Sequence, residues 1–190
     1  ASDPTQFSEI TGIKKGDNKP GESVFTIFIT LNVGVEKVAP HKIGHMFHIN
    51  DISHTLEDSR NTTLKEFGNL TNMEISIPAV RDPSLAPKGQ TGIMISAPMF
   101  ATTDTWDWLG ANDDEYEVMK REVVEGMLKS VSTVIPQLKD ESKIAYISSV
   151  TPRDYQMMTQ NSGGSITGRG STPARSPTWT ACWTRRHTKR

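Results

Sequence analysis

The clearest strand pattern in the chain spans 24–31, where β-branched and aromatic residues follow one another in the order Val-Phe-Thr-Ile-Phe-Ile-Thr-Leu. A nearly continuous apolar run of this length is typical of a strand that is covered on both faces. We therefore predict a buried strand here, preceded by a solvated turn that is rich in Lys, Gly, Asn and Pro. Weaker patterns predict four further strands, over 44–51, 73–80, 91–98 and 143–150.

Apolar residues at three- and four-residue spacing predict one long amphipathic helix. Asn112 is a typical N-cap, and three acidic residues follow it, where their charges suit the positive end of a helix dipole. Pro136 ends the pattern. The apolar stripe consists of Tyr116, Met119, Val123, Met127, Val131 and Val134.

Two shorter segments carry helix-start signals. Asp58 or Ser59 could cap a helix that runs to Phe67 and is ended by Gly68. The sequence Thr-Pro-Arg-Asp at 151–154 opens a turn or a helix, with its acid among the first helical amides. Several strands with one long helix between them predict an α+β domain, with a mainly antiparallel or mixed sheet.

Composition narrows the class of protein. A chain of 190 residues is long enough for one domain of ordinary size. Its apolar runs fall well short of the roughly 18–20 residues that a membrane-spanning helix needs, although a peripheral contact with a membrane stays open. Cys182 is the only cysteine, which excludes an intramolecular disulfide and suits a reducing, cytoplasmic setting. Neither a secretory signal nor an initiating Met is present at the start, so we expect further sequence upstream.

Residues 169–190 differ sharply from the rest. They contain six Lys or Arg, no acid, and no Leu, Ile, Val, Met or Phe. Such a segment buries too little apolar surface to fold by itself, and its composition is also what translation in a wrong reading frame produces. We therefore predict a domain over 1–168 and a disordered or frameshifted basic tail over 169–190. The tail mixes Arg with Trp, but without a recognisable nucleic-acid fold it does not predict a nucleic-acid interface.

The most specific string in the chain lies at 77–89, Ile-Pro-Ala-Val-Arg-Asp-Pro-Ser-Leu-Ala-Pro-Lys-Gly. Its chemistry predicts turns, because Asp82 can accept amide protons from the residues after Pro83, and Pro87 presets the first corner of a turn near Gly89. The string resembles the P-x-x-x-D-P-S-L-A-P-x-G segment of phytoene desaturases, carotenoid isomerases and retinol saturase-like flavoproteins.

Other pieces resemble the same family in the same order. The opening Ala-Ser-Asp-Pro is similar to the S-N-A-D-P element where the family's chain leaves the FAD domain. Ile-Pro-Gln-Leu at 135–138 resembles its I-P-G-L, and 151–155 resembles its T-P-x-D turn. The glycine-rich 163–168 is similar to the G-x-x-x-G return toward the cofactor domain. The family's G-x-G-x-x-G fingerprint and its late glycine-rich flavin element are absent from the chain.

The resemblance implies the substrate-side part of a two-domain, FAD-dependent oxidoreductase. The intact enzyme would desaturate, saturate or isomerise a carotenoid- or retinoid-like polyene, a lipophilic small molecule. The flavin would carry the redox chemistry, so no catalytic residue of this chain is assigned, and the chain alone is expected to be inactive and not to hold FAD. Two other readings stay open: a non-enzymatic isoprenoid- or lipid-binding protein of the same superfamily, and an inactive truncated gene product. The oligomeric state is not predicted.

The resemblance also implies two groups of site residues. The FAD-proximal group is Ser2, Gly163, Gly164 and Gly168. The substrate-pocket group is Phe28, Met94, Trp106 and Trp108, from strands that are candidate pocket walls and from the Thr-rich loop that follows. The two tryptophans could line the mouth of an apolar tunnel, or pack on the sheet as core anchors.

Two polar clusters have competing readings. His41, His45 and His48 could share one helix face and bind a metal, but their β-rich context places 45 and 48 on opposite faces of a strand, so we predict no metal site. Arg153 and Asp154 could orient a substrate or the flavin edge, or form a helix cap and a surface ion pair.

Overall fold

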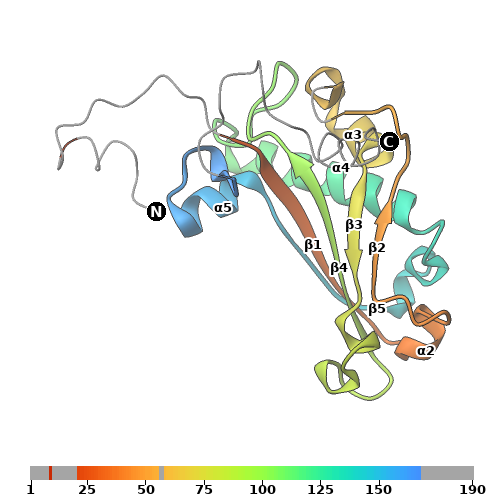
Figure 1. Cartoon of the computed structure of the whole chain (residues 1–190). Helices are drawn as coiled ribbons and strands as arrows, with labels where there is room; N and C mark the ends of the chain where they lie inside the picture. Colours follow the sequence, from red (N-terminus) through yellow and green to blue (C-terminus); the bar gives the residue numbers. More distant parts are fainter. Residues whose placement is uncertain (1–8, 10–20, 56–57, 168–190) are drawn as a thin grey trace, which may run out of the picture.

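The computed structural model describes residue 9 and residues 21–55 and 58–167. They form a five-stranded sheet in the order β2-β3-β4-β1-β5, and every pair of neighbouring strands is antiparallel (Figure 1). The prediction of an α+β fold is confirmed for these residues, and the sheet is antiparallel rather than mixed. The strands are β1 (Ser23–Leu31), β2 (His45–His48), β3 (Met73–Ser76), β4 (Thr91–Met99) and β5 (Ile144–Val150).

Helices pack on one side of this sheet to make the core. α4 (Asp113–Val131) crosses behind the strands in Figure 1 and packs against α3 (Leu64–Leu70). Alternate residues of β1 and β4 point toward them and are buried, among them Phe25, Ile27 and Ile95. The remaining helices are α2 (Val35–Val38) and α5 (Pro152–Thr159), and short 3-10 turns connect the elements.

The strand predicted at 24–31 is β1, but only one of its faces is fully covered. Phe28 points away from the helices and keeps 39% of its surface exposed. The sequence did not predict the exposure of Phe28, because alternation between two faces cannot be recognised in a strand whose faces both carry large apolar residues. The prediction of a strand is confirmed, while the prediction that it is covered on both faces is wrong at its middle.

Local signals placed α4 correctly. The side chain of Asn112 accepts from the amide of Glu115, and the Glu115 carboxylate accepts in return from the Asn112 amide, so the helix begins with a capping box. The helix ends at Val131. Val134 therefore lies beyond the apolar stripe that was predicted to include it, and it is 47% exposed.

The shorter helix differs from its prediction at both ends. Asp58 and Ser59 belong to a separate 3-10 turn, and α3 begins after Thr63, which forms a capping box with Glu66. Gly68 lies inside α3 instead of ending it. Its Cα faces the backbone of Gly126 in α4, so that a Cβ built on Gly68 would lie 2.7 Å from Gly126. This glycine allows two helices to approach closely, which a one-dimensional pattern cannot reveal.

The turns of the 77–89 string are confirmed. The amide of Ser84 donates to Asp82 Oδ1 at 3.0 Å, and the amide of Gln90 donates to the Pro87 carbonyl at 3.0 Å. Gly89 has a φ of 81°, which glycine adopts without strain.

Replacing Gly68 by Ala should cost about 1–3 kcal/mol in overpacking, because the new methyl group meets backbone atoms that cannot turn aside, and should lower the free energy of unfolding by up to about 2 kcal/mol in total. The overpacking outweighs the roughly 1 kcal/mol that alanine gains over glycine inside a helix. Gly92→Ala is the matched control, since a Cβ there meets nothing within 4 Å. Urea denaturation of the three proteins measures the difference. Equal midpoints for Gly68→Ala and the unsubstituted chain would show that the helices do not meet as described.

Candidate functional site

The sheet has an open face, on the side opposite α3 and α4. The β1–β4 register sets Phe28 beside Met94, and β5 adds Ser148 next to Phe28 while β3 adds Ser76 next to Met94. We call these four positions the Phe28 row. Its two central side chains are large and apolar and neither is fully buried. The sequence predicted both of them as substrate-pocket residues, and the structure brings them together.

A polar row lies next to it on the same face. This second row lies two residues from the Phe28 row on each strand, and we call it the Thr26 row. The register aligns its members, which are Glu74 of β3, Ser96 of β4, Thr26 of β1 and Val150 of β5. Thr26 Oγ1 lies 3.2 Å from Ser96 Oγ and 3.2 Å from the Tyr155 hydroxyl of α5. Thr26 is only 3% exposed, so α5 closes this part of the open face. Figure 1 shows α5 beside the N-terminal end of β1.

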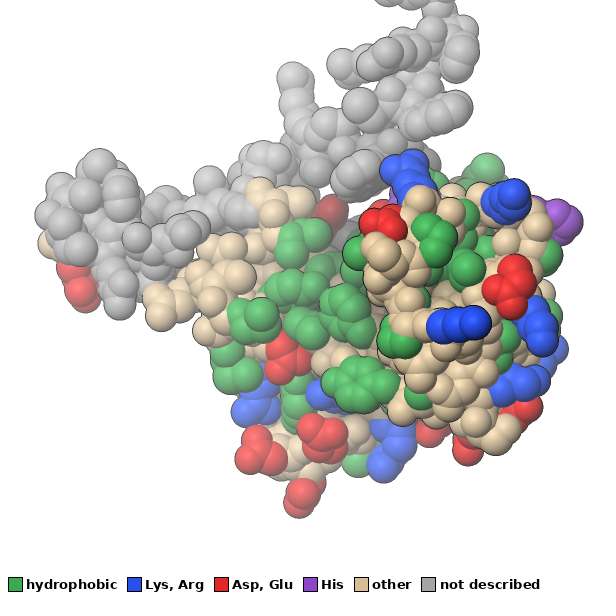
Figure 2. All heavy atoms as spheres, turned by 90° about the horizontal axis from the view of Figure 1, so that it is seen from below, with side chains coloured by type: hydrophobic (Ala, Val, Ile, Leu, Met, Phe, Trp, Pro, Cys, Tyr) green, Lys and Arg blue, Asp and Glu red, His purple; other side chains and the backbone are tan. Residues whose placement is uncertain are grey.

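Two more large aromatic side chains are exposed on the same face, outside the Phe28 row. Phe47, opposite Glu74, is 65% exposed, and Tyr146, opposite Thr30, is 60% exposed. Seen from below, hydrophobic side chains gather on one part of the molecular surface (Figure 2).

A buried tyrosine anchors α5. The Tyr116 hydroxyl of α4 donates to Asp154 Oδ2 at 2.8 Å and lies 3.2 Å from Thr151 Oγ1. Thr151 and Asp154 form the capping box of α5, so one carboxylate serves both the cap and the tyrosine. Burial is the main cause that raises the pKa of Tyr116 to about 12, and the Asp154 carboxylate adds to the rise.

Arg153 belongs to the same anchor. Its guanidinium lies 4.8 Å from the centre of the Tyr116 ring, donates to the Ala111 carbonyl at 3.2 Å, and pairs with Asp113 at 3.3 Å. Arg153 and Asp154 thus take the cap and ion-pair roles that the sequence left open, and they hold α5 to the first turn of α4.

The described glycines of the FAD-proximal group have packing roles. Gly163 and Gly164 are buried with φ of 67° and 59°, and a Cβ on Gly164 would lie 2.0 Å from the Pro152 carbonyl oxygen. Ser23 Oγ donates to the Gly164 carbonyl at 2.7 Å. Ser2 and Gly168 lie outside the described residues. Within the described ranges no strand enters a helix through a G-x-G-x-x-G turn.

The two predicted pocket tryptophans lie apart from Phe28 and Met94. Trp108 is fully buried in the core, 5.8 Å from the Phe25 ring and 5.9 Å from the Tyr116 ring. Trp106 is 5% exposed and donates from Nε1 to the Phe100 carbonyl at 3.3 Å. The four residues therefore do not line one pocket together, and the tryptophans follow the core-anchor alternative. Both tryptophans follow β4, where the alternation of side chains along a strand no longer predicts their direction.

The histidines do not gather. His45 Nε2 lies 2.6 Å from Glu74 Oε1 on the open face, whereas His48 Nε2 lies 3.0 Å from Ser130 Oγ of α4. The prediction that 45 and 48 point to opposite faces is confirmed. No group of three or more His, Cys, Asp or Glu suited to a metal ion occurs in the described part of the chain.

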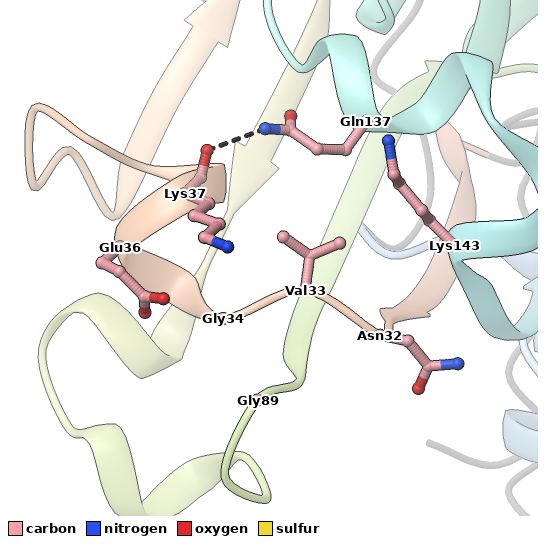
Figure 3. Close-up of a pocket in the computed structure, with 8 residues that line it drawn as sticks. All are labelled: Asn32, Val33, Gly34, Glu36, Lys37, Gly89, Gln137 and Lys143. Carbon is pink, nitrogen blue, oxygen red and sulfur yellow. Dashed lines mark hydrogen bonds between the residues drawn. The ribbon is translucent and has the colours of Figure 1, made fainter.

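Two hollows lie elsewhere on the molecule. The first, of about 560 Å³, lies beyond the end of β1, and five of its eight lining residues are polar or charged; Gln137 Nε2 donates to the Lys37 carbonyl at 2.7 Å (Figure 3). The second, of about 710 Å³, includes Trp106 but is lined by four acidic residues, which suits an apolar ligand poorly. The first is lined by Asn32, Val33, Gly34, Glu36, Lys37, Gly89, Gln137 and Lys143.

No described helix combines the length and the hydrophobicity that a membrane crossing requires. No protein-family model matches the sequence, and comparison with curated proteins gives no significant match.

The anchor of α5 predicts a specific loss of stability in alkali. The folded pKa of Tyr116 is about 12 against an ordinary value of 10, so its contribution is complete below pH 10 and is lost as the pH rises toward 12. Between these values the free energy of unfolding of the unsubstituted chain should fall more steeply than that of Tyr116→Phe. Urea midpoints across pH 8–11.5 measure both slopes, and groups common to both proteins cancel. Parallel curves would contradict a buried, shifted Tyr116.

Proposed function

We propose that this chain supplies the substrate-binding sheet of a FAD-dependent oxidoreductase that acts on a carotenoid- or retinoid-like polyene. The observation that carries the proposal is the Phe28 row, where an aromatic and a thioether side chain lie together on a sheet face that the helices leave uncovered. The resemblance of the 77–89 string and of the elements that follow it supports the same family of activities.

The chemistry of a polyene suits this surface. A long conjugated hydrocarbon offers its protein only apolar contact, and burial of one side chain such as Phe28 against it contributes about 2 kcal/mol. The flexible, polarisable side chain of Met94 adapts to ligands of irregular shape. Exposed Tyr146 on β5 lies diagonal to Phe28 and adds apolar area beside the row, whereas Phe47 on β2 is separated from Met94 by Glu74 and Ser76 of β3.

FAD itself would be held elsewhere in the intact protein, because the described ranges contain no G-x-G-x-x-G turn between a strand and a helix. When bound, the flavin supplies hydride transfer to or from the polyene. The sheet described here would orient the substrate and exclude water from it. We also propose that the protein contacts a membrane peripherally and takes its apolar substrate from there.

A non-enzymatic lipid carrier is the second candidate. The same open face would bind an isoprenoid chain without any redox turnover. The two candidates share the ligand and differ in whether bound flavin changes its redox state.

Phe28→Ser and Met94→Ser should each weaken binding of a hydrocarbon polyene to the chain about tenfold or more, because each removes apolar area from the wall and adds a polar group. Leu85→Ser is the matched control, since Leu85 is a large apolar residue, 63% exposed, in the turn of the 77–89 string. Fluorescence titration with a fluorescent polyene gives the dissociation constants. Equal weakening by all three substitutions would reject the open face as the binding wall.

The oxidoreductase reading predicts a flavin response. The longest form of the protein that its gene encodes should bind FAD when reconstituted, and a bound polyene should change the flavin absorbance near 450 nm under anaerobic conditions. Phe28→Ser should slow that change at low substrate concentration and leave the binding of FAD unaltered. Binding of the polyene with no flavin response would leave the carrier as the function.

A further inference from the structure

We propose that a groove beside α4, which we call the acidic groove, binds residues 169–190 of the same chain. The groove is the hollow of about 710 Å³ between the start of α3, the loop that follows β4 and the first half of α4. The proposed polyene wall lies on the face of the sheet that these helices leave open, so this proposal does not depend on it.

The acidic groove combines four carboxylates with an apolar floor. Leu64, Trp106, Val118 and Met119 form the floor, and Val118 keeps 44% of its surface exposed. No described residue that lines the groove is Lys, Arg or His. A suitable ligand must therefore bring cations together with apolar groups, because an anion would be repelled and a purely apolar ligand would leave the carboxylates without partners. The carboxylates belong to Asp107, Asp114, Glu115 and Glu122.

The charge of the groove is not neutralised within the part of the chain that the structure describes. None of the four carboxylates forms an ion pair with a described residue. Asp107 and Glu115 each use one oxygen to accept from backbone amides, whereas Asp114 and Glu122 accept no hydrogen bond from described residues. The helix dipole stabilises the acids in the first turn of α4, but it does not account for Glu122, which lies well beyond that turn.

Residues 169–190 have the complementary chemistry. They contain six Lys or Arg and no acid, while residues 1–168 hold all 22 acidic residues and 15 of the 21 basic ones. Trp179 and Trp183 each offer an apolar ring for the floor and an indole N–H for a carboxylate. The adaptable side chain of Met119 suits contact with such a ring. A segment that is too poor in apolar residues to fold alone can become ordered on a surface of this kind.

The basic segment follows the described chain close to the acidic groove. The amide of Ile166 donates to the Glu22 carbonyl at 3.0 Å, directly before β1. The first residue of β1 pairs with the last residue of β4, and the loop that follows β4 supplies Trp106 to the groove. Fully extended, residues 168–182 span up to roughly 50 Å, against a radius of gyration of roughly 15 Å for a domain of this size. The segment can therefore reach the groove, and its covalent attachment makes even weak contacts sufficient.

The only cysteine, Cys182, lies in the basic segment and allows a direct test on the full 190-residue chain. A nitroxide attached to Cys182 should broaden the amide NMR signals of Leu64, Val118 and Met119 more than those of residues away from the groove, with the reduced label as reference. The broadening should be largest in roughly 0.01 M salt, where the Debye length is about 30 Å. It should fall at least about twofold in roughly 1 M salt, where that length is about 3 Å.

Charge substitutions locate the contact. Asp114→Asn together with Glu122→Gln should lower the broadening at low salt at least about twofold, because two partners of the basic side chains are lost. Glu36→Gln together with Glu141→Gln is the matched control, since it removes the same charge from two exposed positions near the opposite end of β1. The control should keep the broadening of the unsubstituted chain. Urea midpoints of each variant establish that it is folded.

Arg185→Gln together with Arg186→Gln should release the segment to a similar degree, because the substitutions remove the cations instead of the carboxylates. Absence of broadening at the floor residues in low salt would overturn the proposal. Broadening that the groove substitutions leave unchanged would overturn it too. Equal losses in the groove variant and in the control would show a general attraction between opposite charges, without binding in the groove, and would likewise reject it.

Discussion

The division of this sheet into a core face and an open face depends on the antiparallel register between β1 and β4. Nine consecutive residue pairs join the two strands, from Ser23 with Met99 to Leu31 with Thr91. The register assigns one set of alternate residues to the core and the other to the open face. A shift by one residue would exchange the two sets, and Phe28 would enter the core while Ile27 met solvent. The core, the Phe28 row and the Thr26 row are therefore fixed by the same set of backbone hydrogen bonds.

The second constraint is the attachment of α5. Tyr116, Thr151 and Asp154 form a small buried network that joins the first turn of α4 to the first turn of α5. From this anchor Tyr155 reaches Thr26, which divides the open face into a closed polar end and an exposed apolar middle.

Two of the four predicted pocket residues lie together in the structure and two do not, and the difference has a physical reason. Phe28 and Met94 share a row because the β1–β4 register pairs them, and alternation along each strand turns both side chains to the open face. Trp106 and Trp108 lie in a loop, where alternation gives no direction, and they fill the space between the sheet and the helices. The Thr26–Ser96–Tyr155 group was not predicted at all. Hydroxyl residues are common, and nothing in the sequence marks three of them as neighbours across separations of 70 and 129 positions.

The sequence by itself determined the elements whose causes are local. The capping box at Asn112, the turn at Asp82 and the glycine turn at Gly89 each depend on contacts within three residues, which a sequence displays directly. Only the tertiary structure decided the strand order, the open face of β1 and the role of Gly68. These features depend on contacts between elements, and such contacts bring together residues that are far apart in the chain. For this protein, local chemistry positions the elements, and packing between them creates the candidate site.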